Sequence, residues 1–139
     1  MSITGAKVVL DTNIFITIFG RKSPTRWIFD KILSGELELC VSTEILLEYE
    51  EIITRLISPT VAANLLELVL TTKSIRYTNV HFSWGLIEED PDDNKFIDCC
   101  VSSGAYCIVT NDKHFRGINE SDFPYVKVQT LKEFESEFK

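Results

Sequence analysis

The chain has 139 residues, of which 45% are hydrophobic and 25% are charged, and its formal net charge is −7. This length and composition are typical of a globular domain with its own hydrophobic core, and no apolar run reaches the roughly 18 residues of a membrane-spanning helix. The first residues lack the basic, apolar and small-residue regions of a signal peptide, so we expect a cytoplasmic protein. The acidic balance excludes a protein that coats nucleic acid by bulk electrostatics, but it allows an enzyme that binds a divalent metal through clustered acids.

Short apolar runs alternate with helical patterns from one end of the chain to the other. Five β-branched or otherwise apolar runs predict strands, at residues 7–10, 37–41, 75–77, 106–110 and 126–129. Apolar residues at three- and four-residue spacing predict helices between them, at residues 14–20, 24–34, 43–56, 59–72, 94–103 and from 131 onward. This alternation indicates one α/β domain over residues 1–139, with a mainly parallel sheet and helices on both faces.

Three of these helices have a recognisable start. Ser42 is a predicted N-cap, and Ser58 precedes a proline, Pro59, at the first helical position. Thr130 and Glu133 have the spacing of a capping box. These local signals fix where the helices begin.

Three acids fall at the ends of the predicted elements. Asp11 follows the first strand, Asp112 follows the strand at 106–110 by two residues, and Asp93 begins the helix that leads into that strand. Ligands of an open parallel sheet bind at the carboxyl ends of its strands. Each acid taken alone is more often a turn or cap residue, so the prediction of a site depends on the group.

A fourth acid comes from the helix at 43–56. At about 100° per residue, Glu48 lies nearer the apolar stripe of this helix than Glu44, Glu50 or Glu51, so it should face inward and needs a partner. Clustered carboxylates repel one another, and a hard cation such as Mg²⁺ or Mn²⁺ is their most favourable partner. We expect an oxygen-only site, which does not suit zinc.

The stretch "DPDDNKFIDCC" at residues 90–100 also has the beginning of a calcium loop. Asp90, Asp92 and Asn94 match positions one, three and five of an EF-hand. Position six requires glycine and position twelve requires glutamate, but the chain has Lys95 and Val101 there. The loop therefore fails the pattern, and Asp90 and Asp92 are most simply turn residues.

The cysteines do not indicate a metal or a disulfide framework. No C-x-x-C pair is present, and neither His81 nor His114 has zinc-finger spacing to a cysteine. Each cysteine lies in an apolar segment, so we expect reduced, buried thiols. The four cysteines are Cys40, Cys99, Cys100 and Cys107.

Taken in order, the motifs "VVLDTNIFI", "VSTEILLEYEEI" and "DPDDNKFIDCCVSSGAYCIVTNDKHF" resemble those of the PIN-domain family. The likeness covers nearly the whole chain and is greatest to its single-domain toxins of toxin–antitoxin pairs. The resemblance implies a three-layer α/β/α fold with four or five strands and a metal-dependent ribonuclease activity. Matched by position, the family's acids are Asp11, Glu48, Asp93 and Asp112.

The resemblance also assigns supporting residues and a mechanism. Asn13 and Thr110 match polar residues that hold the acidic loops, and Asp98 is either a further metal ligand or a supporting residue. One or two Mg²⁺ or Mn²⁺ ions, held by Asp11, Asp93 and Asp112, would activate water to hydrolyse RNA. Glu48 would bind metal, directly or through water, or orient the attacking water.

Basic residues near the expected cleft are candidates for binding the RNA backbone, although each is also compatible with an ordinary solvated charge. They are Arg21, Lys22, Arg26, Lys95, Lys113 and Arg116. Trp27, Trp84 and Phe115 are candidates for base stacking or for the core. The toxin resemblance further implies a cognate antitoxin partner and a homodimer.

Two other functions remain open on the sequence. A phosphohydrolase with Asp11 as its covalent nucleophile would need a second acid two residues later, where the chain has Asn13. A catalytically weak or inactive PIN-like module that binds nucleic acid or regulates would keep the fold without the chemistry. Because all four acids are present, the sequence favours the nuclease.

Overall fold

The computed structural model describes residues 5–88, 90–118 and 121–139, so residues 1–4, 89 and 119–120 of the expected domain lie outside the described residues. Five parallel strands form one sheet in the order β3-β2-β1-β4-β5. Their bounds are β1 Ala6–Leu10, β2 Leu37–Val41, β3 Ile75–Tyr77, β4 Cys107–Val109 and β5 Val128–Gln129. The predicted mainly parallel sheet is confirmed.

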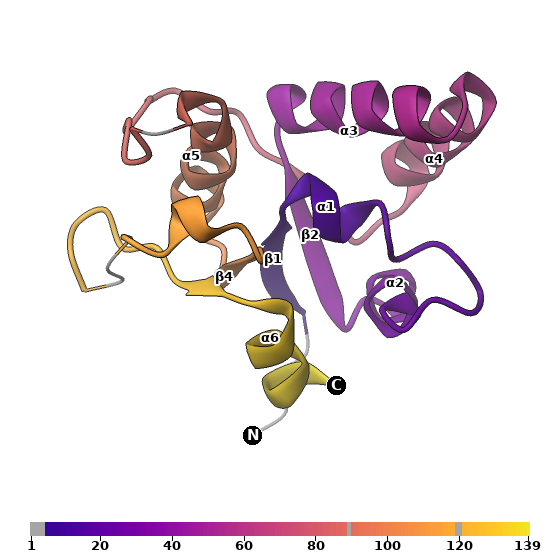
Figure 1. Ribbon diagram of the computed structural model, residues 1–139. Coiled ribbons are helices and arrows are strands. Elements are labelled where there is room, and N and C mark those ends of the chain that lie inside the picture. Colours follow the sequence, from indigo (N-terminus) through magenta and orange to yellow (C-terminus); the bar gives the residue numbers. More distant parts are fainter. Residues whose placement is uncertain (1–4, 89, 119–120) are drawn as a thin grey trace.

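Helices flank the sheet and complete a three-layer α/β/α fold (Figure 1). The α-helices are α1 Thr12–Phe15, α2 Arg26–Ser34, α3 Thr43–Leu56, α4 Pro59–Thr71, α5 Asn94–Ser103 and α6 Leu131–Phe138. Two short 3₁₀ turns are η1 Pro91–Asp93 and η2 Lys113–Phe115. Helix α5 packs on β1, β2 and β4, whereas α2 and α6 meet each other through the stacked rings of Trp27 and Phe134. Among the described helices, none combines the length and the apolar composition that crossing a membrane requires.

The local start signals act as the sequence predicts. The side chains of Ser42 and Ser58 accept hydrogen bonds from the backbone N–H groups three residues later. Thr130 and Glu133 form both hydrogen bonds of a capping box. Because a helix start leaves backbone donors without partners, each cap stabilises its helix where it begins.

The largest difference from prediction lies between β1 and α2. The segment 14–20 was expected to be helical, but α1 ends at Phe15 and α2 begins only at Arg26. Hydroxyl groups compete for the backbone here: Ser23 donates to the carbonyl of Thr17, and Thr25 hydrogen-bonds to the Thr17 side chain at 2.8 Å. Such local bonds favour a turn over a continued helix.

Helix α3 is fixed over the end of β1 by Tyr49. The Tyr49 hydroxyl donates to the Leu10 carbonyl at 2.5 Å, and its ring stacks on Phe15 with centroids 3.8 Å apart. The buried stripe of α3 runs through Ile45, Tyr49 and Ile53 at a spacing of four residues. Glu48 lies beside this stripe and contacts Thr12, two residues beyond the end of β1.

The core lies on both faces of the central strands, where Val8, Val9 and Leu10 of β1 and all three residues of β4 are buried. All four cysteines are buried free thiols. From β1 the chain passes to β2 and β3 on one side, and it later enters β4 and β5 on the other. The strand order therefore reverses between β1 and β4, which is where open parallel sheets bind their ligands.

Candidate active site

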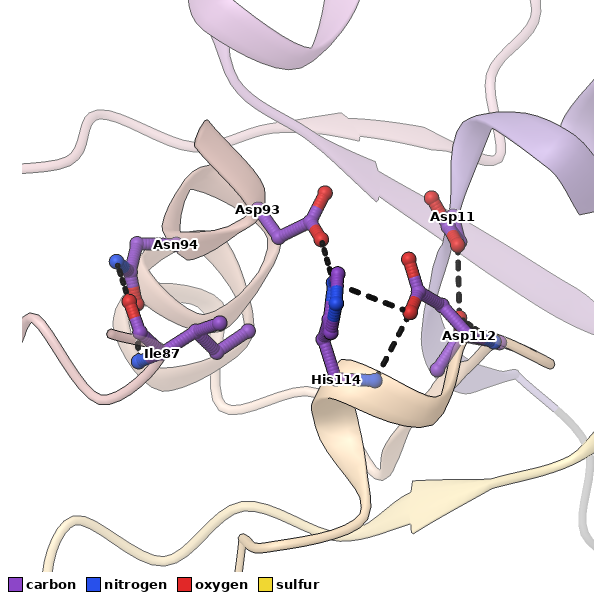
Figure 2. A network of polar contacts seen from close by, with 7 residues as sticks. Asp11, Ile87, Asp93, Asn94, Asp112 and His114 are labelled. Carbon is purple, nitrogen blue, oxygen red and sulfur yellow. Dashed lines mark hydrogen bonds and ion pairs between the residues drawn. The ribbon is translucent and has the colours of Figure 1, made fainter. Parts of the chain in front are cut away.

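Asp11 lies at the carboxyl end of β1, at this switch point. Its side chain is 5% exposed, and it accepts a hydrogen bond from the Thr110 hydroxyl at 2.7 Å (Figure 2). It does not cap α1. Burial raises the pKa of Asp11, the bond from Thr110 partly offsets this, and the charges of Asp112 and Glu48 raise the pKa further.

Asp112 is connected to Asp11 through the same threonine. The backbone N–H of Asp112 donates to the Thr110 hydroxyl oxygen at 3.0 Å, so Thr110 holds both acidic loops. One Asp112 oxygen, Oδ1, accepts the backbone N–H of His114 at 2.9 Å and caps η2. The cap fixes the turn after β4, and the bond from Thr110 to Asp11 holds this turn against the turn after β1.

Asp93 stands at the start of α5 but does not cap it, because its side chain makes no capping hydrogen bond. Burial raises the pKa of Asp93 to about 7, and the charges of Asp90, Asp11, Asp112 and Glu48 contribute. Repulsion from these carboxylates favours a proton or a cation on Asp93. Of these acids, Asp93 is thus the one whose ionised form a bound cation would stabilise most.

Glu48 faces inward, but both of its oxygens are already engaged. The Thr12 hydroxyl donates to Oε2, and the Lys95 ammonium lies 2.7 Å from Oε1. Lys95 also pairs with Asp92 at 3.1 Å. Burial alone would lower the pKa of Lys95, but its hydrogen bonds to Glu48 and Asp92 raise it. The Lys95 ammonium is therefore paired with acids of the site and is not an ordinary solvated charge.

Asp98 lies apart from these acids, although it is only five residues beyond Asp93 on α5. Its Oδ1 accepts the backbone N–H of Trp84 at 3.0 Å, and it lines a hollow of about 480 Å³ together with Glu44 and Lys95. Burial raises the pKa of Asp98, the bond from Trp84 lowers it, and Glu44 raises it. In this structure Asp98 holds the segment before α5.

His114 also borders the acids, although the sequence pattern indicates only oxygen ligands there. Its Nδ1 atom lies 3.7 Å from Asp93 Oδ2 and 3.4 Å from Asp112 Oδ1 (Figure 2). Nitrogen and oxygen atoms of Asp90, Asp93 and His114 lie within 4.8 Å of one another. The signal that could have found this histidine is its position two residues after Asp112 in the turn "TNDKHF".

The predicted RNA-binding residues fall into two groups. Arg21, Lys22, Lys113 and Arg116 are exposed. Arg26 and Lys95 already have protein partners. Arg26 donates to the Phe19 carbonyl at 2.5 Å and pairs with Asp30, and Lys95 pairs with Glu48. Asn13 is exposed and, with Asp11 and Asp112, lines a second hollow of about 430 Å³. Exposed cations and an open hollow thus adjoin the acids.

The aromatic candidates divide in a similar way. Phe115 is completely buried, and Trp27 packs on Phe134. Trp84 is only half-buried and contacts Phe82 and Phe123, both of which are exposed. Phe115 is therefore a core residue, whereas Trp27 and Trp84 are both half-buried.

An open parallel sheet with four acids at its switch point defines a class of α/β protein suited to binding a divalent cation. A family model described as PIN domain matches residues 7–114, so the chain belongs to the PIN-domain family. This family consists of nucleases. A comparison with curated proteins finds no significant match.

Two solved structures have the same fold. One is a crystal structure of VapBC2 from Rickettsia felis bound to a DNA fragment from its promoter, with 14% identity, a TM-score of 0.63 and coverage of 89% of this chain and 98% of the other. The second is DNA-bound VapBC from Salmonella typhimurium, with 18% identity, a TM-score of 0.58 and coverage of 90% and 98%. At these identities the likeness establishes the α/β/α fold alone.

Proposed function

We propose that this PIN-domain protein is a metal-dependent endoribonuclease that hydrolyses RNA phosphodiester bonds, with residues 1–139 acting as one nuclease domain. The observation that supports the proposal is the contact network that joins the acids: Thr110 connects Asp11 to Asp112, and His114 Nδ1 lies 3.4 Å from Asp112 and 3.7 Å from Asp93. Burial and the charges of the other acids, Asp11, Glu48 and Asp112 among them, raise the pKa of Asp93 accordingly. These acids come from four separate parts of the chain. So close a group of carboxylates is unfavourable unless protons or a cation neutralise it.

The residues fit a divalent ion. Asp93 Oδ2 is buried and has no hydrogen-bond partner among the described residues, so a ligand position is available. Asp11, Asp93 and Asp112 would hold the ion, and oxygen atoms are the ligands that Mg²⁺ and Mn²⁺ prefer. When bound, such an ion lowers the pKa of water and offsets charge on a scissile phosphate.

Two residues beside the ligands have separate roles. Glu48 already accepts bonds from Thr12 and Lys95, so it would act on the attacking water or through water on the metal. Lys95 holds Glu48 in place and adds a positive charge on the substrate side. Thr110 keeps the Asp11 and Asp112 loops in register.

The RNA backbone would follow the exposed cations around the site. Lys113 and Arg116 adjoin the Asp112 turn, and Arg21 and Lys22 lie in the loop between α1 and α2. Contacts between cations and phosphates position a strand without reading its bases. Neutralisation of the acids by metal would let a chain of net charge −7 approach a polyanion.

The test is RNA cleavage with and without Mg²⁺ or Mn²⁺. The wild-type protein should cleave only with metal, and Asp11→Asn should remove cleavage while circular dichroism shows an unchanged fold. Asp30→Asn is the matched control, because Asp30 is an exposed aspartate of α2 that pairs only with Arg26 in the described residues. If the wild-type protein cleaves no RNA with either metal, the alternative of an inactive nucleic-acid-binding or regulatory module takes its place, and cleavage that persists in Asp11→Asn would contradict the role of Asp11.

We further propose that this nuclease is the toxin of a toxin–antitoxin pair. The structural likeness to VapBC complexes supports a protein partner. By the family resemblance, this partner would cover the acidic site with an arginine that meets the carboxylates. Induced expression should slow growth, and co-expression of a small protein encoded beside the chain should restore it. Normal growth with intact Asp11 would contradict the toxin role without contradicting the nuclease.

A homodimer is the third part of the proposal. Large apolar side chains are exposed on and beside the α3–α4 pair, and they support a second copy as their cover. They are Leu47, Leu56, Ile57 and Leu70. Sedimentation should give twice the chain mass of 15.9 kDa, and a species of 15.9 kDa alone would exclude the dimer.

A further inference from the structure

His114 presents an imidazole nitrogen to the acids that are candidates for metal binding. Nδ1 of His114 and Oδ2 of Asp93 are both buried, they lie 3.7 Å apart, and neither has a hydrogen-bond partner in the described residues (Figure 2). Buried polar atoms are nearly always hydrogen-bonded, so two unpaired ones that face each other require an explanation. An ion between them would satisfy both atoms.

The separations suit two ligands of one ion better than a direct hydrogen bond. Ligands that each lie about 2.1 Å from an ion are separated by at most about 4.2 Å. His114 Nδ1 is within this limit of Asp93 and also of Asp112, which is 3.4 Å away. A hydrogen bond between nitrogen and oxygen would normally be about 2.7–3.2 Å long.

The surrounding residues support this geometry. Asp90 places a further carboxylate oxygen within 4.8 Å of the ligand atoms of Asp93 and His114, close enough to bind the same ion after a small movement of its side chain. The backbone N–H of His114 donates to Asp112, and the next residue, Phe115, is completely buried. The backbone of His114 is therefore fixed beside Asp112, which places the imidazole close to the acids.

We propose that His114 is a nitrogen ligand of the ion held by Asp93, and that it makes the site select a first-row transition ion over Mg²⁺. The inference extends the proposed function, because it requires a metal at the same acids. Mg²⁺ takes oxygen ligands almost exclusively and retains its waters. Imidazole binds first-row transition ions more readily, with affinities that rise from Mn²⁺ to Cu²⁺.

The test is pulsed electron paramagnetic resonance of Mn²⁺ bound to the full chain. The chain has two histidines, His81 and His114, so labelling histidine with ¹⁵N gives a signal of limited origin. We expect hyperfine coupling between Mn²⁺ and a histidine nitrogen in wild type and in His81→Gln, whose parent residue is exposed. The coupling should disappear in His114→Gln.

Calorimetry provides the second measurement. His114→Gln should weaken Mn²⁺ binding about 10-fold or more and change Mg²⁺ binding much less, whereas His81→Gln should change neither. Bound Mn²⁺ without nitrogen coupling in wild type would overturn the inference and leave the acidic metal site intact. This wild-type result does not depend on whether a variant folds.

A different failure would concern the proposed function itself. If the wild-type chain binds neither Mn²⁺ nor Mg²⁺, the metal site at Asp93 is wrong, and the role of His114 is overturned with it. If coupling persists in His114→Gln and disappears in His81→Gln, the nitrogen ligand is the other histidine. Each outcome thus separates the imidazole from the acids.

Discussion

Two neighbouring residues at the start of α5, Asp93 and Asn94, have opposite relations to the fold (Figure 2). Asn94 is buried, accepts the N–H of Ile87 at 2.9 Å and donates to the carbonyl of Ile87 at 2.9 Å. Asp93 points to the other side, where one oxygen has no hydrogen-bond partner in the described residues and like charges surround it.

The difference shows which polar residue serves the structure and which is available to a ligand. Asn94 satisfies two backbone groups of the segment before α5, so it stabilises the fold. Asp93 destabilises the protein without metal, because its charge is brought among other carboxylates. Asp98, on the same helix, resembles Asn94, since it accepts a backbone N–H from Trp84.

The largest effect should come from replacing these two aspartates in turn. Asp93→Asn should reduce metal-dependent RNA cleavage by more than about 100-fold, since even residues that only support metal ligands contribute 10–100-fold. Asp98→Asn keeps an oxygen to accept from Trp84, so we expect less than about a threefold change. Initial cleavage rates at saturating Mn²⁺ measure both, and equal losses would make Asp98 a ligand as well.

The second effect concerns stability. Asn94→Ala removes two hydrogen bonds and leaves the buried N–H and carbonyl of Ile87 without their partner, which should cost about 2 kcal/mol. The melting temperature should fall by about 5–10 °C. Thermal unfolding followed by circular dichroism measures this, with Asn64→Ala, an exposed position on α4, as the control. Equal melting temperatures would show that Asn94 is not a structural residue.

The third effect depends on pH and should be the smallest. The pKa of Asp93 is about 7 in the folded chain, against an ordinary value of 3.8 that applies to the unfolded chain. Between pH 3.8 and pH 7 the folded state therefore binds a proton that the unfolded state does not. Without metal, stability should therefore be greatest near pH 4 and fall as the pH rises to 7. Asp93→Asn removes this loss, so in chelator it should melt on the order of 3–5 °C above wild type at pH 8.

With bound metal, the wild-type chain should melt above Asp93→Asn at pH 8, the reverse of the order expected in chelator. Bound Mn²⁺ stabilises the wild-type fold at pH 8 by mass action, and Asp93→Asn should gain much less. Melting curves at pH 5 and pH 8, each with chelator or Mn²⁺, provide the four measurements. If the melting temperature of the wild-type chain in chelator is the same at pH 5 and pH 8, ionisation of Asp93 does not destabilise the fold and this prediction is wrong.

Much of this molecule follows from local sequence. The hydroxyl groups of Ser42, Ser58 and Thr130 accept hydrogen bonds from backbone N–H groups three residues later. The starts of α3, α4 and α6 can therefore be predicted without knowledge of the tertiary structure. Gly35 ends α2 with a positive φ of 83°, which glycine adopts without strain. Alternating strands and helices then predict a parallel sheet, which brings residues such as Asp11 and Asp112 to one edge.

Other features depend on contacts between distant segments. The sequence selects Asp93 for the site but leaves Asp98 open between ligand and supporting residue, and only the tertiary structure brings Asp98 to the backbone N–H of Trp84. Lys95 was predicted as an RNA contact, but the packing of α5 beside α3 brings it to Glu48, 47 residues away in sequence.

Apart from the segment between β1 and α2, the sequence by itself determined the secondary structure, the sheet and the acids that follow its strands, because hydrogen bonds within a few residues and apolar periodicity control these. Only the tertiary structure decided which polar side chains meet. Thr110 donates to Asp11, which lies 99 residues away in sequence. His114 lies close to Asp93, although α5 and β4 separate them in sequence. Burial and the repulsion between like charges arise only when these segments pack, so the properties of the site were set there.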